Sequence, residues 1–357
     1  MAVFGFLDFF ELCEIVSSLD RTLDFLCENR LIRPFDEPPT CTKLLNDSHV
    51  CGLPMKIGNV SKITDGKRWK CSKYCNCSKS IREGSIFFKS KLPLQKLLVL
   101  IWHWCMGDNN FQAVQKFGLS QTTVVDWFNI LREVCSSDLL TMDIRIGGPG
   151  IIVEMDESNL KKKPKHNVGS AWHMNEQWVW GAVERNDSSK FVSMFLPHHP
   201  NSIGRQIADR RRGAILTKIL EWIKEDTIIY WDMCSAYWVN TSEGLRNLEN
   251  IPECLEWRNL ETGRVGKGYT HKAVNHSVNF VDPNEREVHT QTIEGCWSAK
   301  LKHGFKKMKG VSPALMPSYV DVAMWSSWKT ASGNDIEKNQ RFYVEFIEAI
   351  KRIYPFS

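Results

Sequence analysis

Ile151-Ile152-Val153-Glu154-Met155 leads directly into Asp156, and Thr227-Ile228-Ile229-Tyr230-Trp231 leads directly into Asp232. Both runs have the length and composition of buried strands, and each is followed by an aspartate. A third acidic residue, Glu294, stands at the head of a lysine-rich stretch with helical character. Rigid strands hold carboxylates in place, and paired carboxylates bind divalent cations. The three residues therefore predict a two-metal phosphodiester site, whose cations activate the attacking oxygen and stabilise the leaving one.

The pattern around these runs predicts a mixed α/β domain. A boundary is expected at Gly147-Gly148-Pro149-Gly150, where the pattern changes to strands. Two further strands, 177–184 and 190–196, flank a polar turn and should form a hairpin. A helix is expected at about 213–225, before the strand that ends at Asp232. The expected order of elements is three strands, a helix, a strand and then further helices. This order matches the ribonuclease H-like arrangement in outline.

The rest of the chain is expected to form smaller segments. Residues 1–45 have apolar residues at helical spacing and reach a proline-rich break near their end. After this N-terminal helical segment we expect a zinc-ribbon-like segment at 46–90, a helical domain at 91–146, a catalytic domain at 150–330 and a C-terminal helix at 331–357. In the helical domain we expect helices at 94–106, 110–117 and 121–134.

The second and third of these helices suggest a helix-turn-helix. Gly118-Leu119-Ser120 forms the turn, and Ser120 is well placed as an N-cap. Three polar residues at the start of the last helix would face a major groove: Gln121, Thr122 and Thr123. The alternative is an ordinary helical hairpin, and the position before an acidic triad favours the DNA interpretation.

The cysteines at 46–90 predict a structural metal site. Cys51, Cys71, Cys75 and Cys77 are the candidate ligands of one Zn²⁺. The match to a zinc ribbon is incomplete, because Ser48 stands where the first CxxC knuckle needs a cysteine. His49 or Cys41 are alternative ligands, and a ribbon without zinc is the other interpretation.

Bulk properties are those of a globular protein in a reducing compartment. The 357-residue chain has a formal net charge of +5 and twelve scattered cysteines, unlike a short secreted disulfide framework. The N-terminus lacks the basic region of a signal peptide, and the longest aliphatic run, 97–102, is too short to cross a bilayer. We therefore expect an intracellular protein without a membrane partner, and a nuclear location if it acts on DNA.

Residues 150–330 resemble the catalytic domain of Merlin-superfamily DNA transposases and their bacterial insertion-sequence relatives. The upstream stretches 69–77 and 80–88 and the helices after them resemble that family's zinc-ribbon and helix-turn-helix region. The resemblance is carried by Val153-Glu154-Met155-Asp156-Glu157-Ser158, by 178–185, by Trp231-Asp232 with Ala236-Tyr237, by 274–283 and by His289-Thr290-Gln291-Thr292-Ile293-Glu294-Gly295-Cys296-Trp297.

The resemblance implies a DDE-type transposase on a ribonuclease H-like fold. By motif position, Asp156, Asp232 and Glu294 would bind two Mg²⁺ or Mn²⁺ ions. Transposon ends and target DNA would be the double-stranded partners, and the DNA-bound form would be a homo-oligomer. The chain departs from its relatives at the first ribbon knuckle, at 161–166 and at Ser326-Ser327. None of these departures removes a carboxylate of the triad, so they affect the expected recognition of DNA ends more than the expected cleavage chemistry.

Basic and polar residues near the triad are candidate DNA contacts. One cluster follows Glu294 and the other precedes the expected helix at 213–225; a solvated charged face is the alternative for both. Asn275, His276 and Trp297 are candidate supporting residues, with Trp297 packing its helix against the sheet. The candidate DNA-binding residues are Lys300, Lys302, Lys306, Lys307, Arg210, Arg211 and Arg212.

Two other functions compete with an active transposase. One is a transposase-derived DNA-binding protein that no longer transposes. The other is a general ribonuclease H-like nuclease, which the upstream ribbon and helix-turn-helix disfavour because such an enzyme needs no sequence reader. The intact carboxylate triad favours the enzyme.

Overall fold

The computed structural model shows a mixed α/β chain that divides into two compact units, 1–138 with 332–357 and 139–331. No helix among the described residues is long and apolar enough to cross a bilayer. The structure describes residues 8–46, 49–71, 75–160, 177–196, 212–232, 239–241, 244–246, 268–274, 287–307, 311–330 and 335–356.

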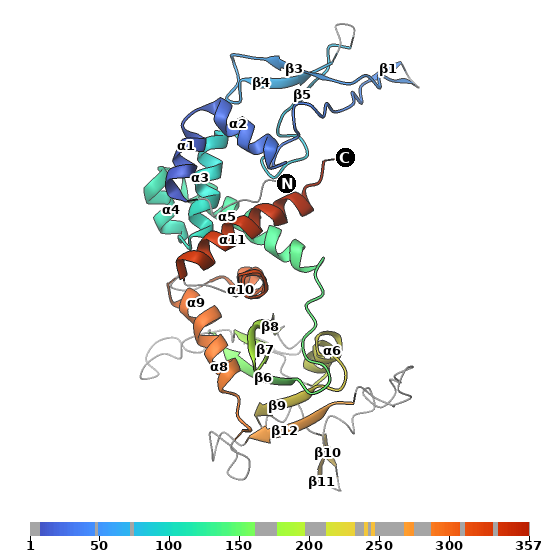
Figure 1. The fold of residues 1–357 in the computed structure, drawn as a ribbon, viewed down its shortest axis with the longest axis vertical. Coiled ribbons are helices and arrows are strands. Elements are labelled where there is room, and N and C mark those ends of the chain that lie inside the picture. The colour runs from blue at the N-terminus through green and yellow to red at the C-terminus, as the bar shows by residue number, and fades with distance from the viewer. Residues whose placement is uncertain are drawn as a thin grey trace, which may run out of the picture. The chain divides into compact units, whose positions relative to one another are not determined.

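The first unit is built on helices (Figure 1). Its C-terminal helix, α11, packs against α3, where the Phe346 ring centroid lies 4.9 Å from that of Trp104. Arg352 of α11 also bonds the fully buried Asp138 of α5 through two nitrogens. The helices are α1 (Phe9–Val16), α2 (Leu19–Glu28), α3 (Leu94–Cys105), α4 (Asn110–Phe117), α5 (Gln121–Leu139) and α11 (Asp335–Ile353).

A turn joins helices α4 and α5 at the position that the sequence predicts. Gly118 ends α4 with φ of 59°, a left-handed conformation that glycine adopts without the strain of a Cβ atom. Ser120 caps α5, because its Oγ accepts a hydrogen bond from the Thr123 amide at 3.2 Å. The sequence signals for this turn are therefore confirmed.

Short antiparallel strands make up the cysteine-bearing segment. Its three-stranded sheet is tied to the following turn by the buried ion pair between Arg82 and Asp65, with an Arg82 Nε to Asp65 Oδ2 distance of 2.7 Å. The hairpin is β1 (Leu44–Asn46) with β2 (His49–Val50), and the sheet is β3 (Lys56–Asn59), β4 (Lys67–Lys70) and β5 (Ser78–Ser80).

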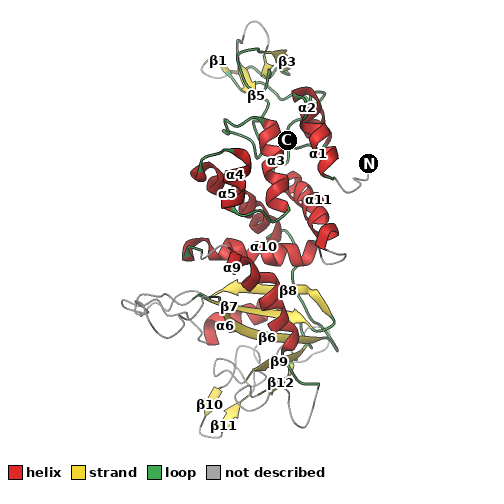
Figure 2. Ribbon diagram, turned by 90° about the vertical axis from the view of Figure 1, so that its left-hand side faces the viewer, coloured by secondary structure: helices red, strands yellow, loops and turns green. Residues whose placement is uncertain are grey.

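The second unit contains a five-stranded mixed sheet in the order β12-β9-β6-β7-β8 (Figure 2). Strands β6, β7 and β8 form an antiparallel meander, while β9 pairs parallel to β6 and β12 pairs parallel to β9. The strands are β6 (Ile152–Asn159), β7 (Trp178–Glu184), β8 (Asp187–Phe195), β9 (Ile228–Asp232) and β12 (Thr270–Val274), and a separate hairpin joins β10 (Val239–Thr241) to β11 (Gly244–Arg246).

Helices cover both faces of this sheet. On one face, Trp222 of α6 packs on Trp180, with ring centroids 6.2 Å apart. On the other face, Trp297 meets the ring of Phe191 edge to face at 5.8 Å. Helix α10 packs along β8, where the Trp328 indole donates to the Phe191 carbonyl. The helical elements are α6 (Arg212–Trp222), α8 (Gln291–Cys296), a π-helical turn (Trp297–Lys302), α9 (His303–Lys307), a 3₁₀ turn (Pro313–Leu315) and α10 (Met316–Lys329).

Strands β6 and β8 are longer than the sequence predicts, and β8 begins at Asp187, before the expected position 190. The apolar run ends at Met155, but β6 continues to Asn159 because β7 pairs with it along that whole length. Its parallel pairing with β9 stops at Glu154. Asp156 therefore lies inside a strand, just beyond the point where the parallel partner is last paired.

Candidate functional site

Asp156 is half-buried on β6, and its side chain is held by a residue from the helix that follows the sheet. The indole Nε1 of Trp297 donates to Asp156 Oδ2 at 2.9 Å. This hydrogen bond fixes the direction of the carboxylate. It also links the strand that bears Asp156 to the segment that bears Glu294.

Gly181 makes room for this contact. It pairs with Asp156 across β6 and β7. A Cβ atom at Gly181 would lie 2.5 Å from Trp297 Cη2 and 2.8 Å from the Val192 carbonyl oxygen. Only glycine therefore lets the indole reach Asp156 across the face of the sheet.

Asp232 is the last residue of β9, the parallel neighbour of β6. The observed register pairs Glu154 with Tyr230, and Asp156 and Asp232 each lie two residues further along their strands. The backbone thus brings these two positions to the same region of the sheet. The side chain of Asp232 lies outside the described part of the structure.

Glu294 is exposed on α8, the helix that packs against β6. Glu154 anchors the start of that helix: its Oε2 accepts from the Thr292 amide at 2.8 Å and the Ile293 amide at 3.2 Å. Its Oε1 accepts from Arg185 Nε at 2.7 Å. Glu294 immediately follows these anchored amides, so its backbone position is fixed relative to β6.

Several candidate residues fall where the structure gives no description. Asn275, His276, Arg210 and Arg211 lie outside the described residues. Arg212 begins α6, and Lys306 and Lys307 end α9, but their side chains are not described.

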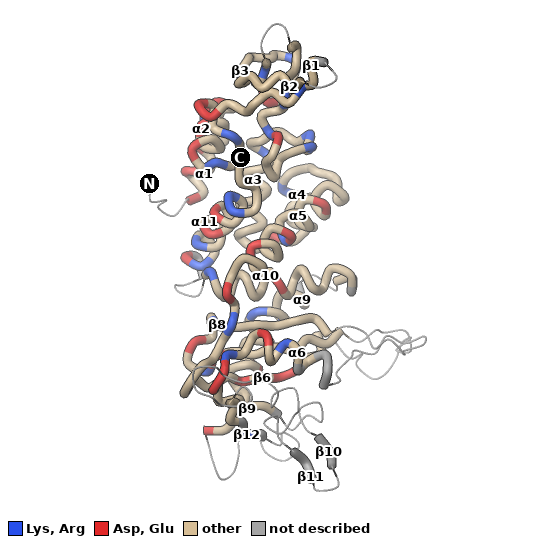
Figure 3. The backbone as a smooth tube through the Cα atoms, turned by 90° about the vertical axis from the view of Figure 1, so that its right-hand side faces the viewer, with Lys and Arg blue, Asp and Glu red and all other residues tan. Residues whose placement is uncertain are grey.

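The described lysines after Glu294 do not have the spacing around the helix axis that a continuous α-helix would give them. A π-helical turn spans Trp297–Lys302, so Lys302 is rotated away from the position that α-helical spacing from Glu294 gives it. Lys300 Nζ bonds the Ser188 carbonyl at 2.9 Å and also the hydroxyl of Ser327. Lys300 thus contributes to contacts inside the unit. Lys and Arg residues are spread over many elements in the described part (Figure 3).

The candidate DNA-reading residues begin α5. Gln121 and Thr122 are exposed, and Thr123 is half-buried. The hydroxyls of Thr122 and Thr123 lie 2.9 and 2.8 Å from the Ser120 hydroxyl. The first turn of α5 therefore presents a compact, uncharged polar surface.

A second candidate site is a cluster of four cysteines in the first unit. The Sγ atoms of Cys41, Cys51, Cys71 and Cys75 all lie within 4.8 Å of one another. Cys41 lies 3.4 Å from Cys75, and Cys51 lies 3.6 Å from Cys71. A tetrahedral zinc with Zn–S bonds of about 2.3 Å requires sulfurs about 3.8 Å apart. Four cysteines at this spacing are close enough to hold a metal ion.

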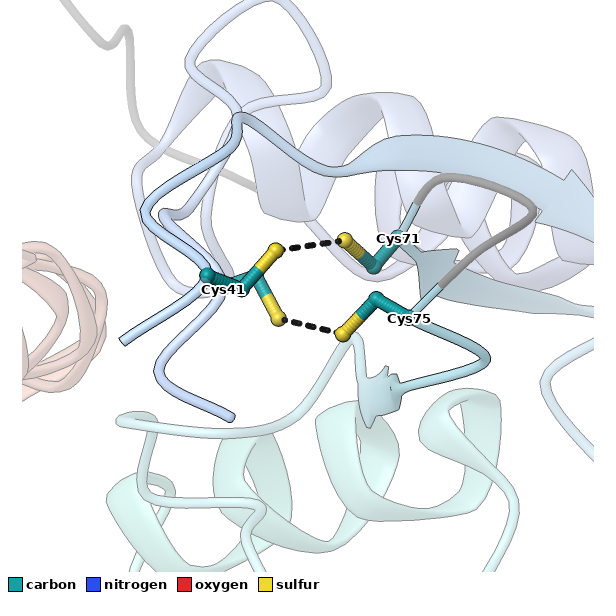
Figure 4. A group of neighbouring side chains, drawn as sticks. Cys41, Cys71 and Cys75 are labelled. Carbon is teal, nitrogen blue, oxygen red and sulfur yellow. Dashed lines mark hydrogen bonds between the residues drawn. The ribbon is translucent and has the colours of Figure 1, made fainter. Parts of the chain in front are cut away.

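The ligand set differs from the sequence prediction at one position. Cys41, raised only as an alternative, joins the cluster, and Cys77 lies outside the group of four. Figure 4 shows Cys41 pointing toward Cys71 and Cys75, which lie at the two ends of one short segment. The Lys43 amide lowers the pKa of the Cys41 thiol to about 7, while burial raises the pKa of Cys75 to about 12. An amide hydrogen bond to sulfur favours the thiolate, which is the form that binds metals.

Sequence reasoning missed two residues of the carboxylate site. Glu154 lies in an apolar run and in a stretch that carries the family resemblance, and neither pattern assigns it a role, although a charged residue in the middle of a buried strand is itself a signal. Arg185 ended a matched stretch but received no role. No protein-family model matches this sequence, and a search of curated proteins gives no match.

Proposed function

We propose that this chain is a DDE-type transposase-like protein that cleaves DNA and joins strands with the help of divalent cations. The carrying observation is the convergence of three chain segments. Asp156 on β6 and Asp232 on the parallel neighbour β9 lie at matching positions, and α8, which bears Glu294, is bonded to β6 through Trp297. The order of three antiparallel strands followed by two parallel ones supports a ribonuclease H-like domain.

The donor set fits Mg²⁺ or Mn²⁺. Carboxylate oxygens are the protein ligands that Mg²⁺ prefers, and one or two per ion suffice when phosphate and water complete the shell. Asp156, Asp232 and Glu294 would hold the ions. Bound there, the ions would lower the pKa of an attacking water and stabilise the departing oxygen. Trp297 would keep Asp156 oriented.

The first unit would supply DNA recognition. We propose that Zn²⁺ binds Cys41, Cys51, Cys71 and Cys75. The metal would stabilise a ribbon that is too small to form a sufficient hydrophobic core of its own. The exposed polar start of α5 would enter the major groove, as expected for the second helix of a helix-turn-helix. Action on DNA would place the protein in the nucleus.

The test is a cleavage assay on DNA that carries the terminal sequences flanking the gene. The zinc-loaded full-length protein is incubated with Mg²⁺, with Mn²⁺ or with a chelator. We expect nicking at the element end with either ion and none with chelator. Binding of the same DNA without cleavage under all three conditions would instead support a DNA-binding protein derived from a transposase.

A further inference from the structure

Glu154 is a fully buried carboxylate that the proposed chemistry does not use. It lies two residues before Asp156 on β6, so both side chains lie on the face that α8 covers. Burying a carboxylate is costly unless it is paired and hydrogen-bonded. Four donors meet it: the Thr292 and Ile293 amides, the Thr292 hydroxyl at 2.9 Å, and Arg185 Nε.

These contacts make Glu154 the cap of α8. Thr290, the residue at the N-cap position, makes no side-chain capping bond. Glu154 reaches from the sheet to take the amides of the first turn, where a negative charge also suits the helix dipole. The helix start is therefore attached to β6 as well as to its own preceding loop, where His289 Nδ1 accepts from the Gln291 amide at 3.4 Å.

Arg185 completes the attachment from the end of β7. Its guanidinium binds Glu154 and donates to the carbonyls of Glu287 and His289, just before α8. The guanidinium also lies over the Tyr230 ring of β9, 4.7 Å from the ring centroid. One cation thus ties the approach to α8 to both strands that carry the proposed aspartates.

The helix has a second anchor on the same strand. Glu154 holds the Thr292 and Ile293 amides, and Asp156 holds the Trp297 indole, so residues two apart on β6 fix points on either side of Glu294. Two attachment points restrict both sliding and rotation of a short helix. Such pre-organisation raises metal affinity because ligands that are already in place lose less conformational freedom when the ion binds.

We propose that Glu154 and Arg185 are positioning residues that set the place of Glu294 relative to Asp156, and so set the metal affinity of the site. This inference rests on the proposed function, because it requires the carboxylates to bind a divalent ion. The competing explanation is an ion pair that only stabilises the fold. The two explanations differ in whether metal affinity changes when the fold remains intact.

The test measures Mn²⁺ binding by calorimetry on the zinc-loaded full chain, alongside the Mg²⁺ dependence of cleavage. Glu154→Gln should weaken Mn²⁺ binding by about tenfold or more, the usual effect of losing a group that orients a metal ligand. Thr292→Val removes only the hydroxyl donor to Glu154 and leaves all charges, so it should weaken binding about threefold. Thr292→Ser restores the hydroxyl and should bind within about twofold of wild type.

A matched control separates positioning from stability. Asp138→Asn makes the same kind of change in a buried carboxylate–arginine pair of the other unit and should leave Mn²⁺ affinity unchanged. If Glu154→Gln does not fold, the Thr292 pair still decides the question. If Thr292→Val and Glu154→Gln both bind Mn²⁺ with wild-type affinity, or if Asp138→Asn loses as much Mn²⁺ affinity as they do, the positioning inference is overturned. The proposed function would still stand. A wild-type chain that neither binds Mn²⁺ nor cleaves DNA overturns the proposed function as well.

Discussion

At the scale of single residues, the proposed site depends on one aromatic contact. Trp297 was expected to pack a helix on the sheet, and in addition its indole donates to Asp156. Gly181 permits the approach, and Phe191 supports the ring from the side. The sequence could indicate that Trp297 is buried, but not which carboxylate its nitrogen meets. That partner is 141 residues away along the chain.

Trp297→Phe should keep most of the ring packing and lose the hydrogen bond to Asp156. A hydrogen bond to a charged group contributes about 1.5–3 kcal/mol, and here it also orients a proposed metal ligand. We expect single-turnover, Mg²⁺-dependent cleavage to slow by about tenfold or more, with DNA affinity within twofold of wild type. Unchanged cleavage in Trp297→Phe would show that the indole has no part in orienting Asp156.

Gly181→Ala should destabilise the second unit by about 1–3 kcal/mol, because the new methyl group collides with Trp297 and with the β8 backbone. Gly304→Ala is the control, since a Cβ atom there meets nothing within 4 Å in helix α9. It should be neutral or stabilise by up to about 1 kcal/mol. Urea unfolding of both variants measures the difference, and equal stabilities would contradict the packing described for Gly181.

At the scale of secondary-structure elements, the sequence predicts strands and helices better than their ends. Apolar runs identify β6, β7, β8 and β9, because each strand carries fully buried apolar side chains. The extension of β6 past Asp156 could not be predicted, since it comes from pairing with β7 and not from its own composition. The π-helical turn after Trp297 likewise has no recognised signal in the lysine-rich sequence.

The cysteine segment gives a sharp test of ligand identity. Cys41→Ser should lose bound zinc and unfold the short strands around it, because it removes one of four close sulfurs. Cys77→Ser should retain one zinc per chain, because Cys77 lies outside that group. Metal analysis of the purified variants decides between them. Loss of zinc in Cys77→Ser with retention in Cys41→Ser would restore the ligand set predicted from the sequence.

At the scale of the whole molecule, the chain returns to its first unit at its end. We expect a C-terminal helix from the sequence, but not that α11 belongs with the N-terminal helices, because that pairing joins residues more than 200 positions apart. The strand order of the second unit likewise depends on pairing between residues that are far apart in the sequence. Local pattern defines the elements, and long-range contacts such as Arg352 with Asp138 decide their partners.

Arg352→Ala should destabilise the first unit by about 2 kcal/mol or more, because it takes the bonding guanidinium away from a fully buried carboxylate. Lys351→Ala is the matched control on the same turn of α11. Lys351 pairs with the partly exposed Glu348 one turn away on the same helix, so the expected change is within about 0.5 kcal/mol. Thermal unfolding compares the two, and similar melting temperatures would contradict the role assigned to Arg352.

The central claim is that Asp156, Asp232 and Glu294 meet around shared divalent ions. The most direct measurement replaces Mg²⁺ by Fe²⁺ with ascorbate and peroxide, so that radicals formed at the bound ion cut the nearby backbone. We predict fragments that end near residues 156, 232 and 294, all of them suppressed by excess Mg²⁺ and by Asp156→Asn. Cuts confined to one of the three segments, or cuts that neither Mg²⁺ nor Asp156→Asn reduces, would contradict the shared site.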